Sequence, residues 1–124
     1  MAGLSFGQFP QFDRLLTEYY RSVITQARDE LAHSENQQYR TMATWLSELG
    51  AHSAAAVLAE LSSPPLNRRV AELRHIVSAR RRIEQGTYGV CEACGAAIEV
   101  SWLRSHPTAL RCSCCEQRRG PMHS

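Results

Sequence analysis

The chain carries Cys91-Glu-Ala-Cys94 and Cys112-Ser-Cys-Cys115, two short stretches that decide how its last quarter folds. Each has the form C-x-x-C, and 17 residues separate one pair from the other. Paired cysteines at this spacing are typical of a zinc site with four thiolate ligands. A closed site of this kind organises a segment of about 25 residues, which is too short to build a hydrophobic core of its own.

We therefore predict one structural Zn²⁺ bound by four cysteines, at positions Cys91, Cys94, Cys112 and Cys115. Four sulfur ligands leave no open position for water or substrate, so the site is structural rather than catalytic. Four thiolates can also bind an iron–sulfur cluster, but two C-x-x-C pairs favour zinc over such a cluster. The fifth cysteine, Cys114, is read as a bystander, with ligand exchange with Cys115 or thiol reactivity left open. His106 is read as a loop residue rather than a ligand.

Length and composition indicate a globular protein of one domain, or of one helical domain with a small metal module. The chain has 124 residues, of which 44% are hydrophobic and 21% charged. No apolar run approaches the roughly 20 residues that span a bilayer, and no signal peptide is evident at the N-terminus. We expect a cytoplasmic protein with reduced cysteines and no membrane partner.

Charge argues against a free-standing nucleic-acid binder. All 14 basic residues are arginine, and the chain has 12 acidic residues, so its formal net charge is +2. Four thiolates and one Zn²⁺ bring the metal-loaded protein formally close to zero. Proteins that bind nucleic acid by electrostatic attraction carry a strong basic excess instead.

Hydrophobic periodicity predicts a first long helix over about 11–49, with a break near 33–35 left open. Apolar side chains recur at steps of three and four residues on both sides of the polar stretch His33–Gln38. Within that stretch, Ser34 and Gln37 have the spacing of a capping box that restarts a helix. Gly50 is a candidate helix stop, and Ser53 a candidate cap for a short helix over 54–61.

A second long helix is predicted over about 66–85, where Gly86 ends it. The preceding Ser62-Ser-Pro-Pro65 is a break or a hard kink, and a proline at the first helical position is also a good helix start. Two long helices with apolar stripes predict a mainly α fold, a long antiparallel, coiled-coil-like helical hairpin followed by a small zinc-finger module with four cysteine ligands. The turn of the hairpin lies at 50–53 or at 62–65.

The expected organisation is an irregular lead-in over 1–10, a helical hairpin over 11–85, a four-cysteine zinc finger over 86–119 and a tail over 120–124. No metalloprotease, nucleophile-elbow or phosphate-loop motif appears, so we predict no enzyme, no catalytic residue and no cofactor-binding residue beyond the zinc ligands. The run Arg80-Arg-Arg82 is read as a solvated helix face, with a contact patch for a partner as the alternative.

The stretch from Tyr88 to Ile98, with Pro107 five residues before Cys112, resembles the zinc finger of the DksA/TraR family of bacterial regulators. The matching features are a Tyr-Gly before the first cysteine, Glu92 after it and the 17-residue gap. The resemblance is close in sequence over about 66–116. Over 11–65 it is limited to the architecture, a helical hairpin that precedes the finger. It implies a monomer that inserts a helical hairpin into the secondary channel of RNA polymerase, without binding DNA, and changes the lifetime of promoter complexes.

The chain departs from this family in four places. Trp102 replaces an arginine, Glu48 and Ala51 stand where the acidic tip motif is expected, Ser62-Ser-Pro-Pro65 interrupts the second arm, and only nine residues follow Cys115. Two alternatives therefore stay open. One is a zinc-finger module that binds another protein without regulatory tip activity, and the other is a GATA-like DNA-binding finger, which shares the 17-residue gap.

Overall fold

The computed structural model describes residues 9–119, which form α-helices joined by short connections, with no extended strand among them. The predicted lead-in lies largely outside the described residues and the predicted tail entirely so. The order is α1 (Phe9–Ala32), α2 (Gln37–Trp45), the short 3₁₀ helix η2 (Leu46–Glu48), α3 (Ala51–Ala59), α4 (Pro64–Gln85), α5 (Val100–Ser105) and α6 (Ser113–Arg119). The mainly α fold, with α1 packed on α4 and the cysteines in the C-terminal region, is confirmed.

The chain forms two compact units, which are described separately. One unit is Thr17–Val77, and the other joins the segment up to Leu16 to the segment from Ser78 onward. Because the boundary crosses both α1 and α4, the base of the helical pair belongs to the same unit as the cysteine-rich region. Among the described helices none is both long and apolar enough to span a membrane.

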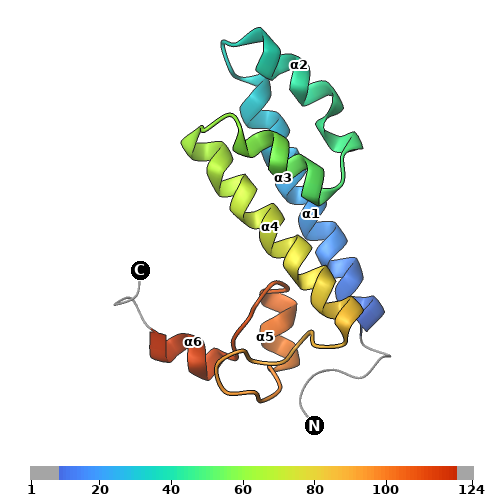
Figure 1. Cartoon of the computed structure of the whole chain (residues 1–124), viewed down its shortest axis with the longest axis vertical. Helices are drawn as coiled ribbons and strands as arrows, with labels where there is room; N and C mark the ends of the chain where they lie inside the picture. Colours follow the sequence, from blue (N-terminus) through green and yellow to red (C-terminus); the bar gives the residue numbers. More distant parts are fainter. Residues whose placement is uncertain (1–8, 120–124) are drawn as a thin grey trace. The chain divides into compact units, whose positions relative to one another are not determined.

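In the unit Thr17–Val77, α1 and α4 lie side by side with α2 and α3 against them (Figure 1). All four helices contribute to one hydrophobic core, and the connection between α1 and α4 is therefore a second pair of helices rather than a simple turn. The fully buried large side chains of this core are Val23, Leu31, Leu46, Leu58, Leu73 and Ile76.

The break near 33–35, which the prediction left open, is present, and it divides the predicted stretch 11–49 into separate helices. α1 ends at Ala32, and α2 begins at Gln37. The cap of α2 is Asn36 rather than Ser34, because the Asn36 side chain accepts hydrogen bonds from the backbone N–H groups of Gln38, at 2.8 Å, and Tyr39, at 3.4 Å. A short side-chain carbonyl suits the free N–H groups of a first helical turn.

The two connections around α3 also differ in detail from the prediction. Gly50 caps the start of α3 rather than ending the previous helix, and α3 begins at Ala51, so Ser53 is not its cap. The break at 62–65 is confirmed, with Ser62 in the left-handed region at φ +52°. Pro64 stands at the first position of α4, two residues before the predicted start. Gly86, with φ +77°, follows the end of α4 as predicted.

One charged side chain is buried in this unit, which the sequence pattern did not predict. Arg69 on α4 is only 6% exposed. Its guanidinium lies 2.9 Å from the carboxylate of Glu72 and 3.9 Å from that of Glu30 on α1, and it donates to the side chain of Gln26. A buried cation persists where carboxylates and hydrogen-bond acceptors surround it. This group therefore ties α4 to α1 at a fixed register.

The capping role of Asn36 is testable. Asn36→Ala removes the acceptor for two N–H groups and should reduce the free energy of unfolding by about 1 kcal/mol. Gln37→Ala is the matched control, since the side chain of this exposed neighbour caps no N–H group, and it should change stability by less than about 0.5 kcal/mol. Urea denaturation followed by circular dichroism measures both. Equal losses in the two variants would contradict the assigned cap.

Candidate metal centre

The first cysteine pair lies in a tight turn that backbone hydrogen bonds close. The N–H of Gly95 donates to the carbonyl of Cys91 at 2.9 Å, and the N–H of Cys91 donates to the carbonyl of Ala96 at 2.8 Å. Gly95 has φ +78°, a conformation that a glycine adopts without strain. The turn brings Cys94 back towards Cys91, so both sulfurs are presented on one side.

The second pair lies at the start of α6 and is held against the first. The N–H of Glu92 donates to the carbonyl of Leu110 at 2.8 Å, which joins the two cysteine-bearing segments directly. The hydroxyl of Ser113 donates to a carboxylate oxygen of Glu99 at 2.9 Å, and the Ser113 N–H donates to the other oxygen at 3.4 Å. The backbone N–H of Glu99 itself, reinforced by these two bonds from Ser113, lowers the pKa of the Glu99 carboxyl, which stays charged beside the first turn of α6.

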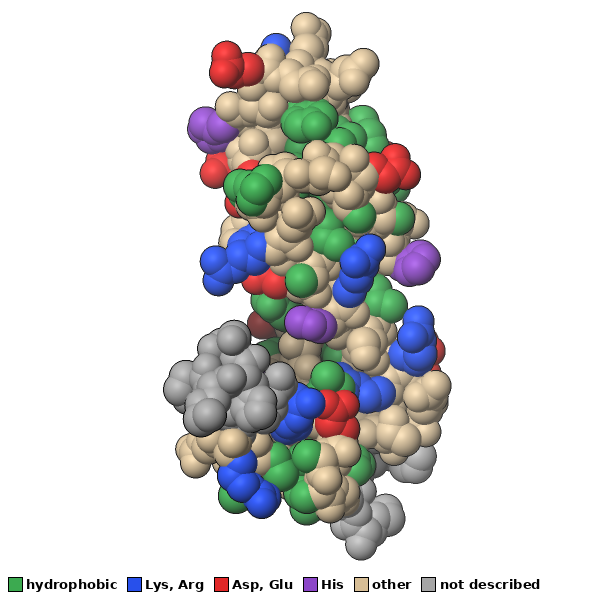
Figure 2. Space-filling view, turned by 60° about the vertical axis from the view of Figure 1, so that its left-hand side comes forward, with side chains coloured by type: hydrophobic (Ala, Val, Ile, Leu, Met, Phe, Trp, Pro, Cys, Tyr) green, Lys and Arg blue, Asp and Glu red, His purple; other side chains and the backbone are tan. Residues whose placement is uncertain are grey.

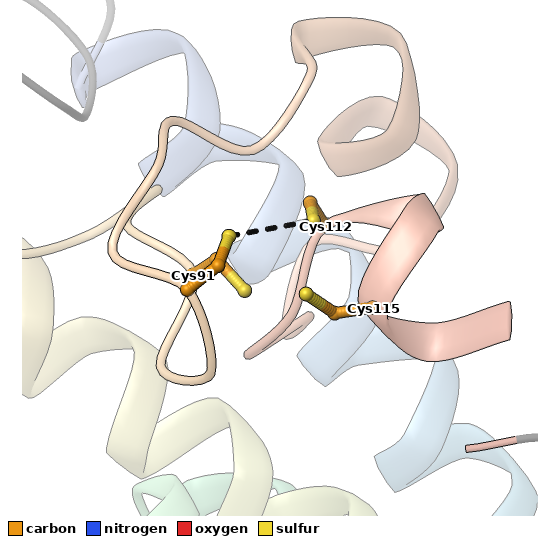
Figure 3. Close-up of side chains that lie close together, drawn as sticks. Cys91, Cys112 and Cys115 are labelled. Atoms are coloured by element: carbon orange, nitrogen blue, oxygen red, sulfur yellow. Dashed lines mark hydrogen bonds between the residues drawn. The ribbon is translucent and has the colours of Figure 1, made fainter. Parts of the chain in front are cut away.

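The structure brings the Sγ atoms of Cys91, Cys94, Cys112 and Cys115 to within 4.8 Å of one another. The sulfurs of Cys94 and Cys112 are 3.9 Å apart, and Figure 3 shows Cys91, Cys112 and Cys115 converging on a common centre. Four sulfurs at about 2.3 Å from a zinc ion are separated from one another by about 3.8 Å in a tetrahedron. The donor atoms and their spacing therefore fit one structural Zn²⁺ ion.

The thiols of Cys91 and Cys115 differ in how readily they ionise. Burial opposes ionisation of Cys91, but backbone N–H groups at Cys112, Cys94 and Ala93 outweigh it and lower its pKa to about 6. A hydrogen bond with the Cys112 sulfur, reinforced by burial and the other sulfurs, raises the pKa of Cys115 to about 12. The protein alone thus favours the thiolate of Cys91 and disfavours that of Cys115, and a bound divalent cation would stabilise the thiolate form of all its ligands.

The cluster is built into a hydrophobic core rather than displayed on a loop. Cys91, Cys112 and Cys115 are at most 7% exposed, whereas Cys94 is exposed. Within the same unit they share a core with the beginning of α1, the end of α4, Tyr88 and α5. The other fully buried members of this core are Phe12, Leu16, Ala79, Ile98 and Leu103. Metal binding and packing of this unit therefore stabilise one another.

Tyr88 is the largest fully buried side chain of this unit. Its hydroxyl donates to the carbonyl of Pro107 at 2.6 Å, and its ring lies 5.6 Å from that of Phe12 on α1. Burial raises the pKa of Tyr88 to about 12. Tyr88 thus links the end of α4 to the segment that leads into the second cysteine pair.

Two ion pairs made by Arg111, which the sequence analysis did not identify, join the two cysteine-bearing segments of the module. The guanidinium of Arg111 lies 2.7 Å from the carboxylate of Glu92 in the first pair and 3.9 Å from that of Glu116 in α6. The spacing of these three residues gives no signal, since Arg111 and Glu92 meet only after the chain has folded. On α6, Nη2 of Arg118 lies 3.6 Å from the sulfur of Cys115, where positive charge stabilises a thiolate.

The two other residues considered as ligands lie outside the cluster. Cys114 is exposed and is not among the four clustered sulfurs. The ring of His106 stacks on Trp102 at 4.1 Å, and its Nδ1 lies 3.3 Å from the Trp102 carbonyl, so it belongs to the surface of α5.

Comparisons with known proteins add little to this geometry. No protein-family model matches the chain, and no solved structure does. An uncharacterized protein of Aquifex aeolicus (strain VF5) is 41% identical over 51 residues, which are 41% of this chain and 35% of that protein. The match spans about a third of the length of that relative and carries no functional name.

The ligand assignment predicts that replacing Cys91 releases zinc, whereas replacing Cys114 does not. Cys91→Ser should release zinc and expose the module to proteolysis, because a buried ligand is lost and the shared core is weakened. Cys114→Ser, the matched control, should keep one zinc per chain. Elemental analysis by mass spectrometry and limited trypsin digestion measure both effects. Stoichiometric zinc in Cys91→Ser, or zinc loss in Cys114→Ser, would contradict the assignment.

Tyr88 predicts a dependence of stability on alkaline pH. Its pKa is about 12 in the folded protein, above the ordinary value of 10.0, so the folded state holds the phenolic proton more tightly than the unfolded state. This contribution is complete below pH 10 and is lost as the pH rises towards 12. Denaturation of the wild type and of Tyr88→Phe between pH 8 and about 11 tests it. The variant should lose about 1 kcal/mol at pH 8, and its stability should fall less steeply above pH 10. Parallel curves would contradict the assignment.

Proposed function

We propose that this protein is a bacterial transcription regulator that contacts RNA polymerase through its helical pair, as the resemblance to the DksA/TraR family implies. One observation carries the proposal. In the unit that holds the cysteines, Phe12 and Leu16 of α1 and Ala79 of α4 share a hydrophobic core with the candidate zinc module. Such a module can act as the base from which paired helices are held for insertion into a channel.

The chemistry of the module supports a binding protein rather than an enzyme. Four thiolates complete the coordination of zinc and leave no position at which water could be activated. Three of the four sulfurs are buried against hydrophobic side chains. We propose a structural role for the metal and no catalytic activity.

Surface charge argues against duplex DNA as the partner. On the face in Figure 2, arginine side chains are interrupted by acidic and hydrophobic ones and do not gather into a continuous basic strip. In the module, Arg111 is neutralised by Glu92 and Glu116. A GATA-like finger needs basic side chains that reach a groove, and Leu103, where a basic residue would follow Trp102, is fully buried.

Only one of the two expected tip positions, Glu48, lies on the surface. Ala51, one of the two positions at which a tip carboxylate is expected, is buried in the core of the unit Thr17–Val77. Glu48 is exposed in η2, and Glu35 and Glu60 are exposed in the connections that precede α2 and α4. We propose that these carboxylates supply the negative charge that acts on a metal-containing catalytic centre.

Competitive binding to core RNA polymerase tests the proposal. The zinc-loaded chain should bind core polymerase, and a protein known to occupy the secondary channel should displace it. Glu35→Gln, Glu48→Gln and Glu60→Gln combined should keep binding and lose the effect on promoter-complex lifetime, while Glu18→Gln, an exposed glutamate on α1, should keep both. Biolayer interferometry and promoter-complex decay assays supply the readouts.

A second candidate follows from the two extra helices. α2 and α3 fill the region that a simple hairpin would leave as an exposed tip, and they bury Ala51. This observation favours a zinc-finger module that binds a different protein and has no tip activity. Failure to bind core polymerase, or binding that a channel occupant does not displace, would overturn the first proposal and leave this one.

A further inference from the structure

A groove of about 630 Å³ lies between α1 and α2, within the unit Thr17–Val77. Its volume is in the range of small-molecule sites. Its polar lining has two guanidinium groups, two hydroxyls, an amide and a carboxylate, from Arg28, Arg40, Thr25, Thr44, Gln26 and Asp29. None of these residues belongs to the candidate zinc site.

Both arginines of the groove are anchored to backbone carbonyls. Nε of Arg28 donates to the carbonyl of Ala43 on α2 at 3.2 Å. Nη1 of Arg40 donates to the carbonyl of Ser34 at 2.8 Å. These bonds restrain the side chains and leave other N–H groups of each guanidinium for a ligand, so less rotational freedom is lost on binding.

Neither guanidinium has a carboxylate partner in the part of the chain that the structure describes. The ion pairs of residues 9–119 include Arg69, Arg80 and Arg111, but not Arg28 or Arg40. The one acid of the lining, Asp29, lies 3.6 Å from Nδ1 of His33. The groove therefore holds two anchored cations and one carboxylate, a net charge of +1.

We propose that this groove binds the phosphate group of a small phosphomonoester. A phosphate monoester carries a charge of about −1.5 to −2 and has three acceptor oxygens, for which the remaining N–H groups of Arg28 and Arg40 and the hydroxyl of Thr25 are the donors, since the Thr44 hydroxyl already donates to the Thr41 carbonyl at 2.6 Å. The groove is open to solvent, since every lining residue except Ala43 is exposed, and this leaves space for an organic part beside the phosphate. This site shares no residue with the metal centre, and its binding can be measured without polymerase.

Titration of the ¹⁵N-labelled, zinc-loaded chain with adenosine monophosphate at constant ionic strength tests the site. Saturable chemical-shift changes should map to residues 25–44 and to the Nε–H signals of Arg28 and Arg40, and adenosine should not reproduce them. Arg40→Gln and Arg28→Gln should each weaken binding by about tenfold, because each removes a charge-assisted hydrogen bond. Each variant's own spectrum checks that it is folded.

Arg21→Gln is the matched control, since Arg21 is exposed on α1 outside the groove, and the substitution changes net charge equally. It should leave the dissociation constant unchanged. Non-saturable shifts, equal shifts with adenosine, or equal weakening by Arg21→Gln and Arg40→Gln would overturn the proposal and indicate non-specific attraction of an anion.

Discussion

Convergence of four cysteine sulfurs is the constraint on which the rest of this structure depends. The sulfurs lie within 4.8 Å of one another, at a spacing that fits the ligands of one zinc ion. The opposite pKa shifts of Cys91 and Cys115 express the same constraint, because the backbone stabilises one negative charge and the neighbouring sulfurs oppose the next. A divalent ion resolves this conflict and thereby holds together two segments that are 17 residues apart in sequence.

The metal centre matters beyond its own segment because its ligands are part of a hydrophobic core. Buried cysteines pack with Tyr88 and with the ends of α1 and α4 that belong to the same unit. Loss of the metal would remove the link between the four sulfurs and leave the hydrophobic packing, the Arg111 ion pairs, and the Tyr88, Glu92 and Ser113 hydrogen bonds to hold this core together. Helix pair and zinc module are thus one folding unit at this end, which is the physical basis for treating the module as an anchor.

Sequence reasoning succeeded where the signal is local and failed where it depends on packing. The cysteine spacing, the stop at Gly86 and the break before Pro64 each follow from the chemistry of a few neighbouring residues. The sequence pattern favours Ser34 over Asn36 as the cap of α2, but Ser and Asn both cap helices, and the exact start of the helix decides between them. The burial of Arg69 depends on Glu30, which lies 39 residues earlier, and the periodicity of the sequence does not predict that contact.

X-ray absorption at the zinc edge of the purified, reduced protein tests the central claim most directly, because it reports ligand type, number and distance around the metal. Our account predicts one zinc per chain surrounded by four sulfur atoms at about 2.3 Å, with no nitrogen or oxygen ligand. A first shell that contains nitrogen or oxygen, or fewer than four sulfurs, would contradict it.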